Sequence, residues 1–317
     1  MYLIGIDIGG TTTRISLGKE EKESLQIIKQ SGVYRTMDFK PLDLISEVIA
    51  YIKENCANYG ISSVGISCGG PLNSKLGIIQ SPPNLPGWDD IKIVQKIEES
   101  LGIKTYLCND ANACALAEWK YGAGKGASNV IFLTFGTGMG AGLILNNRLY
   151  RGNQDMAGEL GHIRLTNHGP VGYGKEGSIE GYCSGGGIEQ MAATKLKEYK
   201  QSGKIEQDRK VDTTAKGIAK LVHQEEFASA VYEESSKALG SVLSGLIDLL
   251  NPEKIIVGSI YERNSKFMHP IVQKVIETEA LLKSRTHCEV VPSILKEKIG
   301  DFAALSVASN GYYEDYI

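Results

Sequence analysis

The fold is decided by the stretch YLIGIDIGGTTT, which covers residues 2–13. Residues 2–8 form an apolar run rich in β-branched side chains, as is typical of a strand. Residues 9–13 form a glycine–threonine turn, and residues 14–17 again have the pattern of a strand. The stretch therefore predicts a strand, a glycine turn and a second strand at the start of the chain.

The same plan recurs about 130 residues further along the chain, which indicates two lobes built alike. Residues 129–134 form an apolar strand pattern, residues 136–140 are GTGMG, and residues 141–145 return to a strand pattern. A glycine turn after a strand lets backbone N–H groups approach phosphate oxygens, because no Cβ stands in the way. Threonine hydroxyls add donors. Both turns are therefore candidate phosphate sites, with two simple hairpins as the alternative.

Other nucleotide-binding motifs fit less well. The glycines at 136–142 have the G-x-G spacing of a dinucleotide site, but that motif must open a helix, and here a strand follows. A Walker loop needs Gly-Lys-Ser/Thr, whereas Gly126 follows Gly124-Lys125. Asp7 stands beside the first turn, where a carboxylate can hold Mg²⁺ directly or through water.

Composition and charge limit the class of protein. A length of 317 residues predicts two compact domains. The net charge is −3 without a basic stripe, so we expect no nucleic acid as a partner. Six cysteines are scattered without a C-x-x-C pair, and no apolar run is long enough to cross a bilayer. The N-terminus enters a strand with no signal peptide, so we expect a cytoplasmic protein that does not bind membranes.

Hydrophobic periodicity predicts further elements in an α/β order. Helix patterns cover 42–52, 91–101, 111–121 and 239–250, and strand patterns cover 63–68, 105–108, 254–257 and 288–291. Asp110 and Asp301 stand at the expected N-cap positions of the helix from 111 and of a last helix through Val307. Asp110 lies at a junction of strand and helix, so capping and catalysis are both open for it.

Six separated motifs, in order along the chain, resemble the ROK family of bacterial sugar kinases. Residues 7–11 resemble the first phosphate loop of the actin–hexokinase–Hsp70 superfamily, and residues 136–138 resemble its second. The six motifs that match the ROK family itself are Gly69-Gly70-Pro71, Pro83-Asn84-Leu85-Pro86-Gly87-Trp88, Asn109-Asp110-Ala111-Asn112-Ala113, Gly158-Glu159-Leu160-Gly161-His162, residues 177–180, and Asn251-Pro252-Glu253 leading to Ile256-Val257-Gly258. The resemblance covers nearly the whole chain.

The resemblance implies an α/β protein with a two-lobed, ribonuclease H-like (actin-like ATPase) fold and an active-site cleft between the lobes. The expected N-terminal lobe is 1–112, completed by a C-terminal helix at 301–317, and the expected C-terminal lobe is 113–300. The implied activity is ATP-dependent phosphorylation of a hexose at its 6-hydroxyl. ATP and Mg²⁺ are the implied cofactors, and a homodimer is the implied assembly.

The resemblance also implies roles for single residues. Asp110 matches the family's general base. The implied sugar ligands are Gly70, Asn84, Asn109, Glu159, His162 and Glu180. The implied nucleotide contacts are Asp7, Gly9, Gly10, Thr11, Thr12, Arg14, Gly136, Thr137, Gly138 and Gly258. Asp7 is also the candidate ligand of Mg²⁺.

Several of these residues have simpler interpretations without the family. Glu159 and Glu180 suit vicinal sugar hydroxyls, because a carboxylate accepts from two donors, but they are otherwise exposed loop carboxylates. His162 touches the sugar in the family and there also binds a structural zinc with three cysteines. Without the family it is a loop histidine with satisfied hydrogen bonds.

The zinc cysteines of the family are missing from this chain. Their positions correspond to Val171, Tyr173 and Ser178, and no soft ligand replaces them, although a zinc site usually needs four tetrahedral ligands. We therefore expect no zinc, and we expect Tyr173 and glycine-rich packing to hold this loop. This loop positions His162 and Glu180. The missing cysteines therefore weaken the inference of which sugar is the substrate.

Glucose is the first expectation for the substrate, with an N-acetylmannosamine or N-acetylglucosamine kinase as the alternative. The donor stays open between ATP and polyphosphate. A sugar-sensing regulator without catalysis is a second class. Such regulators carry a helix-turn-helix ahead of the phosphate loop, and only six residues precede Asp7 here. An intact Asp110 also favours an enzyme over a sensor.

Overall fold

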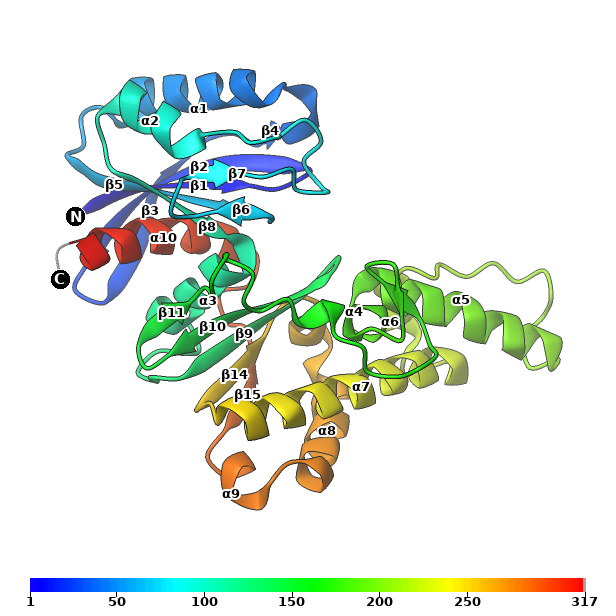
Figure 1. The fold of residues 1–317 in the computed structure, drawn as a ribbon. Coiled ribbons are helices and arrows are strands. Elements are labelled where there is room, and N and C mark those ends of the chain that lie inside the picture. Colours follow the sequence, from blue (N-terminus) through cyan, green and yellow to red (C-terminus); the bar gives the residue numbers. More distant parts are fainter. Residues whose placement is uncertain (316–317) are drawn as a thin grey trace. The chain divides into compact units, whose positions relative to one another are not determined.

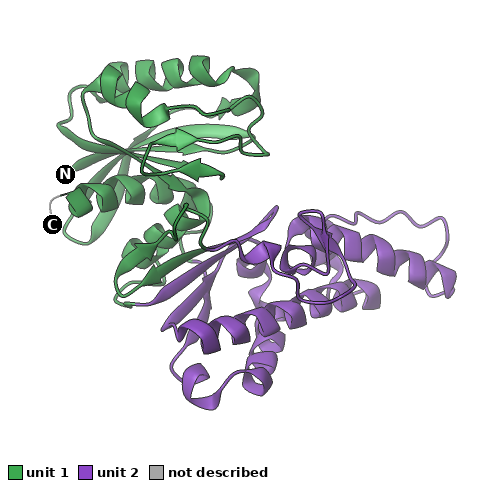
Figure 2. Cartoon of the chain, viewed as in Figure 1, with its two compact units in different colours: residues 1–128, 142–157, 294–317 green, residues 129–141, 158–293 purple. Residues whose placement is uncertain are grey.

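The structure, a computed structural model, describes residues 1–315 (Figure 1). The chain forms two compact units (Figure 2). Unit 1 comprises residues 1–128, 142–157 and 294–317, and unit 2 comprises residues 129–141 and 158–293.

These units do not coincide with the expected lobes. Residues 113–128, 142–157 and 294–300 were expected in the C-terminal lobe and lie in unit 1. Residues 316–317 of the expected C-terminal helix lie outside the described residues. The lobe boundaries of 1–112 and 113–300 therefore stay a prediction.

A six-stranded sheet forms the centre of unit 1, with strand order β3-β2-β1-β5-β8 and with β4 paired to β2. β1 runs antiparallel to β2 and parallel to β5, and β5 runs parallel to β8. The predicted strand, glycine turn and strand are confirmed as β1 and β2. The strands are β1 (Tyr2–Ile8), β2 (Thr12–Glu21), β3 (Ser24–Gln30), β4 (Tyr34–Arg35), β5 (Ile61–Cys68) and β8 (Thr105–Asn109).

One face of this sheet is apolar and is covered by α1 (Pro41–Cys56) and α2 (Ile93–Leu101) (Figure 1). Ile4 and Ile6 alternate along β1 and are buried with Val48 of α1. This pattern arises because alternate residues of a strand share a face, while every third or fourth residue of a helix does so. Both helices were predicted from this periodicity and are confirmed.

The opposite face is lined by small residues, on which α10 (Ile299–Asp315) packs (Figure 1). A Cβ on Gly65 of β5 would overlap the carbonyl oxygen of Ala304, and a Cβ on Gly5 of β1 would lie 2.8 Å from the amide nitrogen of Leu305. Glycines on two strands therefore allow the backbone of α10 to lie directly on the sheet.

Asp301 does not cap this helix, contrary to the sequence prediction. α10 begins at Ile299, directly after the short helix η3 (Lys296–Lys298), so Asp301 lies within its first turn. The carboxylate is buried and accepts a hydrogen bond from Ser16 Oγ of β2 at 2.5 Å. The prediction was wrong because a partner on the sheet satisfies this carboxylate, while the helix starts two residues earlier.

α3 (Asp110–Tyr121) follows β8 in unit 1 and packs against α10. Glu118 near its end is fully buried, and its carboxylate accepts hydrogen bonds from the N–H groups of Ala123, Ile294 and Leu295. The end of α3 is thereby joined to the segment that leads into α10. The short elements of unit 1 are η1 (Thr36–Asp38), β6 (Leu72–Asn73), β7 (Ile78–Ile79) and β11 (Arg148–Tyr150).

Parallel strands β9 (Val130–Phe135), β14 (Lys254–Val257) and β15 (Glu289–Pro292) form the centre of unit 2. The strand order is β11-β10-β9-β14-β15, with β10 at Met139–Leu145. The boundary between the two units falls within β10, at residues 141 and 142. The second predicted strand, turn and strand are confirmed as β9 and β10.

Helices make up most of the rest of unit 2, and α7 packs along α8 (Figure 1). α7 begins at Glu226 rather than at the predicted residue 239, and it ends as predicted at Asn251, whose φ of 46° is a left-handed cap. Within residues 1–315, no helix combines the length and apolar character needed to cross a membrane. The further elements of unit 2 are η2 (Leu160–His162), β12 (Val171–Gly172), β13 (Lys175–Glu176), α4 (Ile179–Tyr182), α5 (Gly185–Gln201), α6 (Ala215–Leu221), α7 (Glu226–Leu250), α8 (Ile260–Glu279) and α9 (Leu282–Arg285).

Candidate active site

The first glycine turn connects β1 to β2 in unit 1. The Gly9 N–H donates to the Thr12 carbonyl at 2.9 Å, which closes the turn. Thr36 of η1 supports it: its Oγ1 donates to the Gly9 carbonyl at 2.7 Å, and its N–H donates to the Thr11 carbonyl at 3.0 Å. The side chains of Thr11 and Thr12 are exposed. The turn therefore presents hydroxyls and amides on a fixed frame, as phosphate binding requires.

Asp7, at the end of β1, lies among charged side chains of the same unit. The pKa of its carboxyl is raised to about 6, chiefly by burial and also by the carboxylates of Asp110 and Asp301. A hydrogen bond from Ser67 and the positive charge of Arg14 lower this pKa. Asp7 and Arg14 are directly opposite each other in the antiparallel pair of β1 and β2.

The surroundings of Asp7 fit Mg²⁺ better than a metal ion that takes all its ligands from protein side chains. Within residues 1–315, no group of three or more His, Cys, Asp or Glu side chains is arranged to hold a metal ion. Mg²⁺ usually keeps several waters and takes only one or two carboxylates, with substrate phosphates as further ligands. A single half-buried carboxylate beside a candidate phosphate turn meets that need.

The predicted sugar ligands of unit 1 lie together beside this turn. Asn84 packs against two glycines: a Cβ on Gly10 would lie 2.6 Å from the Asn84 carbonyl oxygen, and a Cβ on Gly69 would lie 3.3 Å from the Asn84 side-chain amide. A Cβ on Gly70 would lie 3.4 Å from Nδ2 of Asn109. The structure thus brings together Gly70, Asn84 and Asn109, which are distant in sequence.

Asn109, and not Asp110, is the N-cap of α3, contrary to the sequence prediction. Its Oδ1 accepts from the N–H groups of Ala111 and Asn112 at 3.0 and 3.4 Å. The prediction was wrong by one residue because β8 extends to Asn109 and the helix starts with Asp110 itself. Capping is therefore provided by Asn109, and Asp110 is available for other chemistry.

The Asp110 side chain is solvent-accessible. Desolvation by the surrounding protein still raises the pKa of its carboxyl, while hydrogen bonds from the backbone and from Asn109 lower it. Its Oδ1 accepts from the Ala111 N–H at 2.8 Å, which fixes the orientation of the carboxylate. An accessible carboxylate with a raised pKa is suited to accept a proton near neutral pH.

The second glycine turn, residues 136–138 of unit 2, lies against the amino ends of two helices. The Gly185 N–H at the start of α5 donates to the Gly136 carbonyl at 2.8 Å. Ser259, directly before α8, has φ 56° and ψ −109°, and its Oγ would be 3.6 Å from a Cβ on Gly136. Gly258, at the end of β14, is thereby brought near the turn. Helix amino ends favour anions, because the helix dipole is positive there.

Glu180 of α4 contacts the same turn. Its Oε2 accepts from the Met139 N–H at 3.1 Å and would be 2.7 Å from a Cβ on Gly138. A Cβ at position 138 would require this carboxylate to shift. The predicted sugar ligand Glu180 therefore lies beside the predicted phosphate contacts Thr137 and Gly138, and the Thr137 side chain is exposed.

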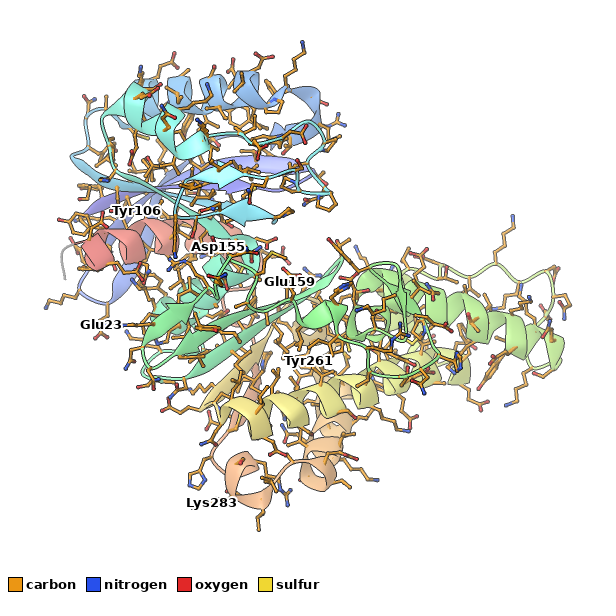
Figure 3. All side chains as sticks on the ribbon, viewed as in Figure 1. Glu23, Tyr106, Asp155, Glu159, Tyr261 and Lys283 are labelled. Atoms are coloured by element: carbon orange, nitrogen blue, oxygen red, sulfur yellow. The ribbon has the colours of Figure 1, made fainter. Side chains whose placement is uncertain are left out.

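Glu159, labelled in Figure 3, directly precedes the short helix η2, and His162 is the last residue of that helix; both residues are exposed. A Cβ on Gly161 would overlap the Met139 carbonyl oxygen, so η2 lies directly on the start of β10. The His162 ring packs edge-on against Tyr173, with ring centroids 5.4 Å apart. Glu159, His162 and Glu180 therefore come from segments that contact the same part of β10.

Hydrogen bonds hold the loop in which the family has its zinc cysteines. Ser178 Oγ donates to the Gly172 carbonyl at 3.0 Å and accepts from the Gly181 N–H at 3.2 Å, which caps α4. The Val171 N–H donates to Gln190 Oε1 at 2.7 Å. Two of the three positions thus take part in hydrogen bonds, and Tyr173 packs on His162. The absence of zinc stays a prediction.

Three parts of these sites lie outside the sequence motifs: Thr36, Asp301 and the start of α5. Thr36 supports the first turn and Asp301 lies near Asp7, but both act across long sequence distances that no local pattern reveals. The start of α5 did have a signal, because Ser184 before three glycines is a preferred N-cap followed by an open helix end.

The comparison with known proteins agrees with this arrangement. The model of the ROK family matches residues 3–310, so this chain belongs to the ROK family. A glucokinase of Thermotoga maritima is 30% identical over 97% of this chain and 97% of its own length. The xylose repressor of Bacillus subtilis is 28% identical over 97% of this chain and 76% of its own length.

One solved structure supports the fold directly. A ROK family glucokinase from Streptomyces griseus, determined in complex with glucose and AMPPNP, is 26% identical and superposes with a TM-score of 0.75. The match covers 98% of this chain and 100% of that chain. The α/β fold expected from the resemblance is therefore confirmed.

Proposed function

We propose that this chain transfers a phosphoryl group from ATP to the 6-hydroxyl of a hexose, with glucose as the preferred substrate. Asp110 carries this proposal, because it is an accessible carboxylate of raised pKa in the same unit as the first glycine turn. The similar proteins of Thermotoga maritima and Streptomyces griseus are both named glucokinases.

The chemistry needs a base, because a sugar hydroxyl is a poor nucleophile until it loses its proton. Asp110 accepts the proton of the 6-hydroxyl while that oxygen bonds to the γ-phosphorus of ATP. The bond from the γ-phosphorus to the bridging oxygen breaks, and ADP leaves with the electron pair. Mg²⁺, held in part by Asp7, supplies neutralisation of the phosphate charge when it is bound.

The remaining roles belong to the same proposal. The sugar contacts are Gly70, Asn84, Asn109, Glu159, His162 and Glu180. The nucleotide contacts are Asp7, Gly9, Gly10, Thr11, Thr12, Arg14, Gly136, Thr137, Gly138 and Gly258. The protein works in the cytoplasm as a homodimer, without nucleic acid or membrane as a partner.

Two alternatives have support of their own. An N-acetylmannosamine or N-acetylglucosamine kinase is the alternative for the substrate, because the loop that carries His162 lacks the family's zinc cysteines. A sugar-sensing regulator without catalysis is favoured by the similarity to the xylose repressor. Asp110 favours the enzyme, because a sensor has no need of an accessible base.

The test is a measurement of ADP release and of sugar phosphate formed, with ATP or polyphosphate as donor and a panel of hexoses and N-acetylhexosamines as acceptors. Asp110→Asn is expected to lower kcat by roughly 10²–10⁴-fold, because it removes the base. The asparagine retains an oxygen for the Ala111 N–H, so the variant should fold and bind sugar. Turnover of no sugar, or normal turnover by Asp110→Asn, would contradict the proposal.

A further inference from the structure

Unit 1 contains a buried carboxylate that the proposed sugar, base and nucleotide contacts do not use. The side chain of Asp301, in the first turn of α10, is only 5% exposed. Its Oδ1 accepts from Ser16 Oγ at 2.5 Å, and its Oδ2 lies 3.5 Å from Nη1 of Arg14. An ionised carboxylate is costly to bury unless it is paired, so Asp301 depends on Arg14 and Ser16, whereas the Arg14 side chain is itself 41% exposed.

Arg14 connects Asp301 to the candidate active site. Arg14 is directly opposite Asp7 in the ladder of β1 and β2, so both side chains emerge on the same face of the sheet. Ser16, two residues further along β2, shares that face. The start of α10 covers it, because a Cβ on Gly300 would overlap Oδ2 of Asp7. The first turn of α10 therefore contacts Asp7 through Gly300 and Arg14 through Asp301.

The charges form a series of carboxylate, guanidinium and carboxylate: Asp301, Arg14 and Asp7. One guanidinium serves two carboxylates, and the ion pair is made with Asp301. While Arg14 is held there, it does not close on Asp7. If Asp301 lost its charge, Arg14 would be left facing Asp7, whose pKa its charge already lowers, and a close pair would neutralise the charge of the Asp7 carboxylate.

We propose that Asp301 is a positioning residue, which holds Arg14 so that the Asp7 carboxylate stays available to the Mg²⁺ that accompanies the nucleotide. The identity of that ion rests on the proposed kinase function. A purely structural role for Asp301, as an anchor of α10 on β2, would use the Ser16 hydrogen bond and would not need the charge.

The test measures Mn²⁺, used as a probe for Mg²⁺, by electron paramagnetic resonance at saturating ADP. Asp301→Asn keeps an oxygen for Ser16 and removes the charge. We expect its Mn²⁺ affinity to fall by about threefold to tenfold, the range of a moderate charge interaction. In the Arg14→Met background, which lacks the competing guanidinium, adding Asp301→Asn should change Mn²⁺ affinity by less than about twofold, and this comparison cancels any effect of Arg14 on the nucleotide.

Ser16→Ala is the matched control, because it removes the hydrogen bond to Asp301 and leaves both charges. We expect it to lower Tm and to leave Mn²⁺ affinity unchanged. Parental affinity in Asp301→Asn, or an equally large effect of Asp301→Asn in the Arg14→Met background, would overturn the proposal. If Asp301→Asn does not fold, Asp301→Ser serves as the neutral variant, with the same expected loss of Mn²⁺ affinity, and parental affinity would overturn the proposal.

This measurement needs no turnover, so it separates the two proposals. If the parent binds Mn²⁺ with ADP but phosphorylates no sugar, only the kinase function fails. If the parent turns over sugar and the variants do not follow the expected pattern, only the role of Asp301 fails. A parent that binds no Mn²⁺ in the presence of ADP also contradicts the role of Asp301.

Discussion

The Asp7 carboxylate, a proposed functional group, lowers the stability of the folded protein at neutral pH. The pKa of its carboxyl is raised to about 6, mainly by burial, so the folded state binds this proton more tightly than the unfolded state. An acid of this kind stabilises the fold below its unfolded-state pKa, and that contribution is lost as pH rises through about 6. At neutral pH the folded protein therefore holds an ionised group that destabilises it.

Asp7→Asn should consequently stabilise the protein at neutral pH, by about 1–3 kcal/mol in the free energy of unfolding. The asparagine mimics the protonated carboxyl, so the gain should shrink as pH falls through about 6 and vanish below the usual aspartate value of 3.8. Urea unfolding of both proteins across this pH range measures it. A gain that does not depend on pH would show that the titration of Asp7 is not its cause.

Asn109 has a structural role and a proposed binding role, which two substitutions can separate. Asn109→Ala removes the N-cap of α3 and should destabilise the protein by about 0.5–2 kcal/mol, whereas Asn109→Ser should keep most of the stability, because serine is also a good cap. Both should weaken glucose binding, since both lose the amide beside Gly70. Urea unfolding and titration calorimetry measure the two effects. Parental glucose affinity in Asn109→Ser would leave Asn109 as a cap only.

The sequence predicts the site residues that stand at ends of strands, but not those whose partners are distant in the sequence. Asp7, the glycine turn and Asp110 stand at ends of strands, where local pattern is informative. Asp110 was misplaced by one residue, because pattern does not tell where a strand stops and a helix starts. Thr36 and Asp301 reach their partners across 27 and 285 residues, so no local signal exists for them.

At the scale of elements, the small residues under α10 should limit what unit 1 tolerates. Gly65→Ala places a Cβ against the backbone of Ala304 and Ala308, which cannot rotate away as a side chain can. We expect a loss of at least about 2 kcal/mol in the free energy of unfolding. Gly60→Ala is the control, because a Cβ there meets nothing within 4 Å. Equal stability of the two variants would mean that α10 shifts freely on the sheet.

The loop before α4 should keep its shape without metal. Its zinc positions are occupied by Val171, Tyr173 and Ser178, and hydrogen bonds and a ring contact tie them in place. Metal analysis of protein purified without chelator should find no stoichiometric zinc, and a strong zinc chelator should leave Tm unchanged. Ser178→Ala should lower Tm, because it removes the cap of α4. Stoichiometric zinc would refute this prediction.

Elements with clear periodicity were predicted well, but their first and last residues were predicted less well. The helices α1 and α2 have one buried face, which makes the helical period visible, and the central strands β1 and β5 are short, nearly fully buried apolar runs. The first half of α7 was missed, although Phe227 and Val231 are buried at helical spacing, because serines and glutamates dilute the pattern there. The early start of α10 follows from η3, which continues directly into the helix.

At the scale of the whole molecule, the family resemblance predicts a homodimer. Sedimentation should give a species of twice the 34.3 kDa of one chain, which dissociates on dilution if the interface is modest. A species of 34.3 kDa at all concentrations used for assay would exclude the dimer. The division into units lay beyond local pattern, because their boundary falls inside a continuous strand, β10.

The packing of α10 on β1 and β5 also affects how the protein is made. A ribosome releases residues 1–128 long before residues 299–315, and in the interval the glycine-lined face of the first sheet has no helix to cover it. Domains usually fold from the amino end during synthesis. Here the first sheet, made first, cannot be completed until α10, made last, has been synthesised. Unit 2 can therefore complete its fold earlier. A nascent chain stopped before residue 299 exposes the uncovered face of the first sheet to chaperones.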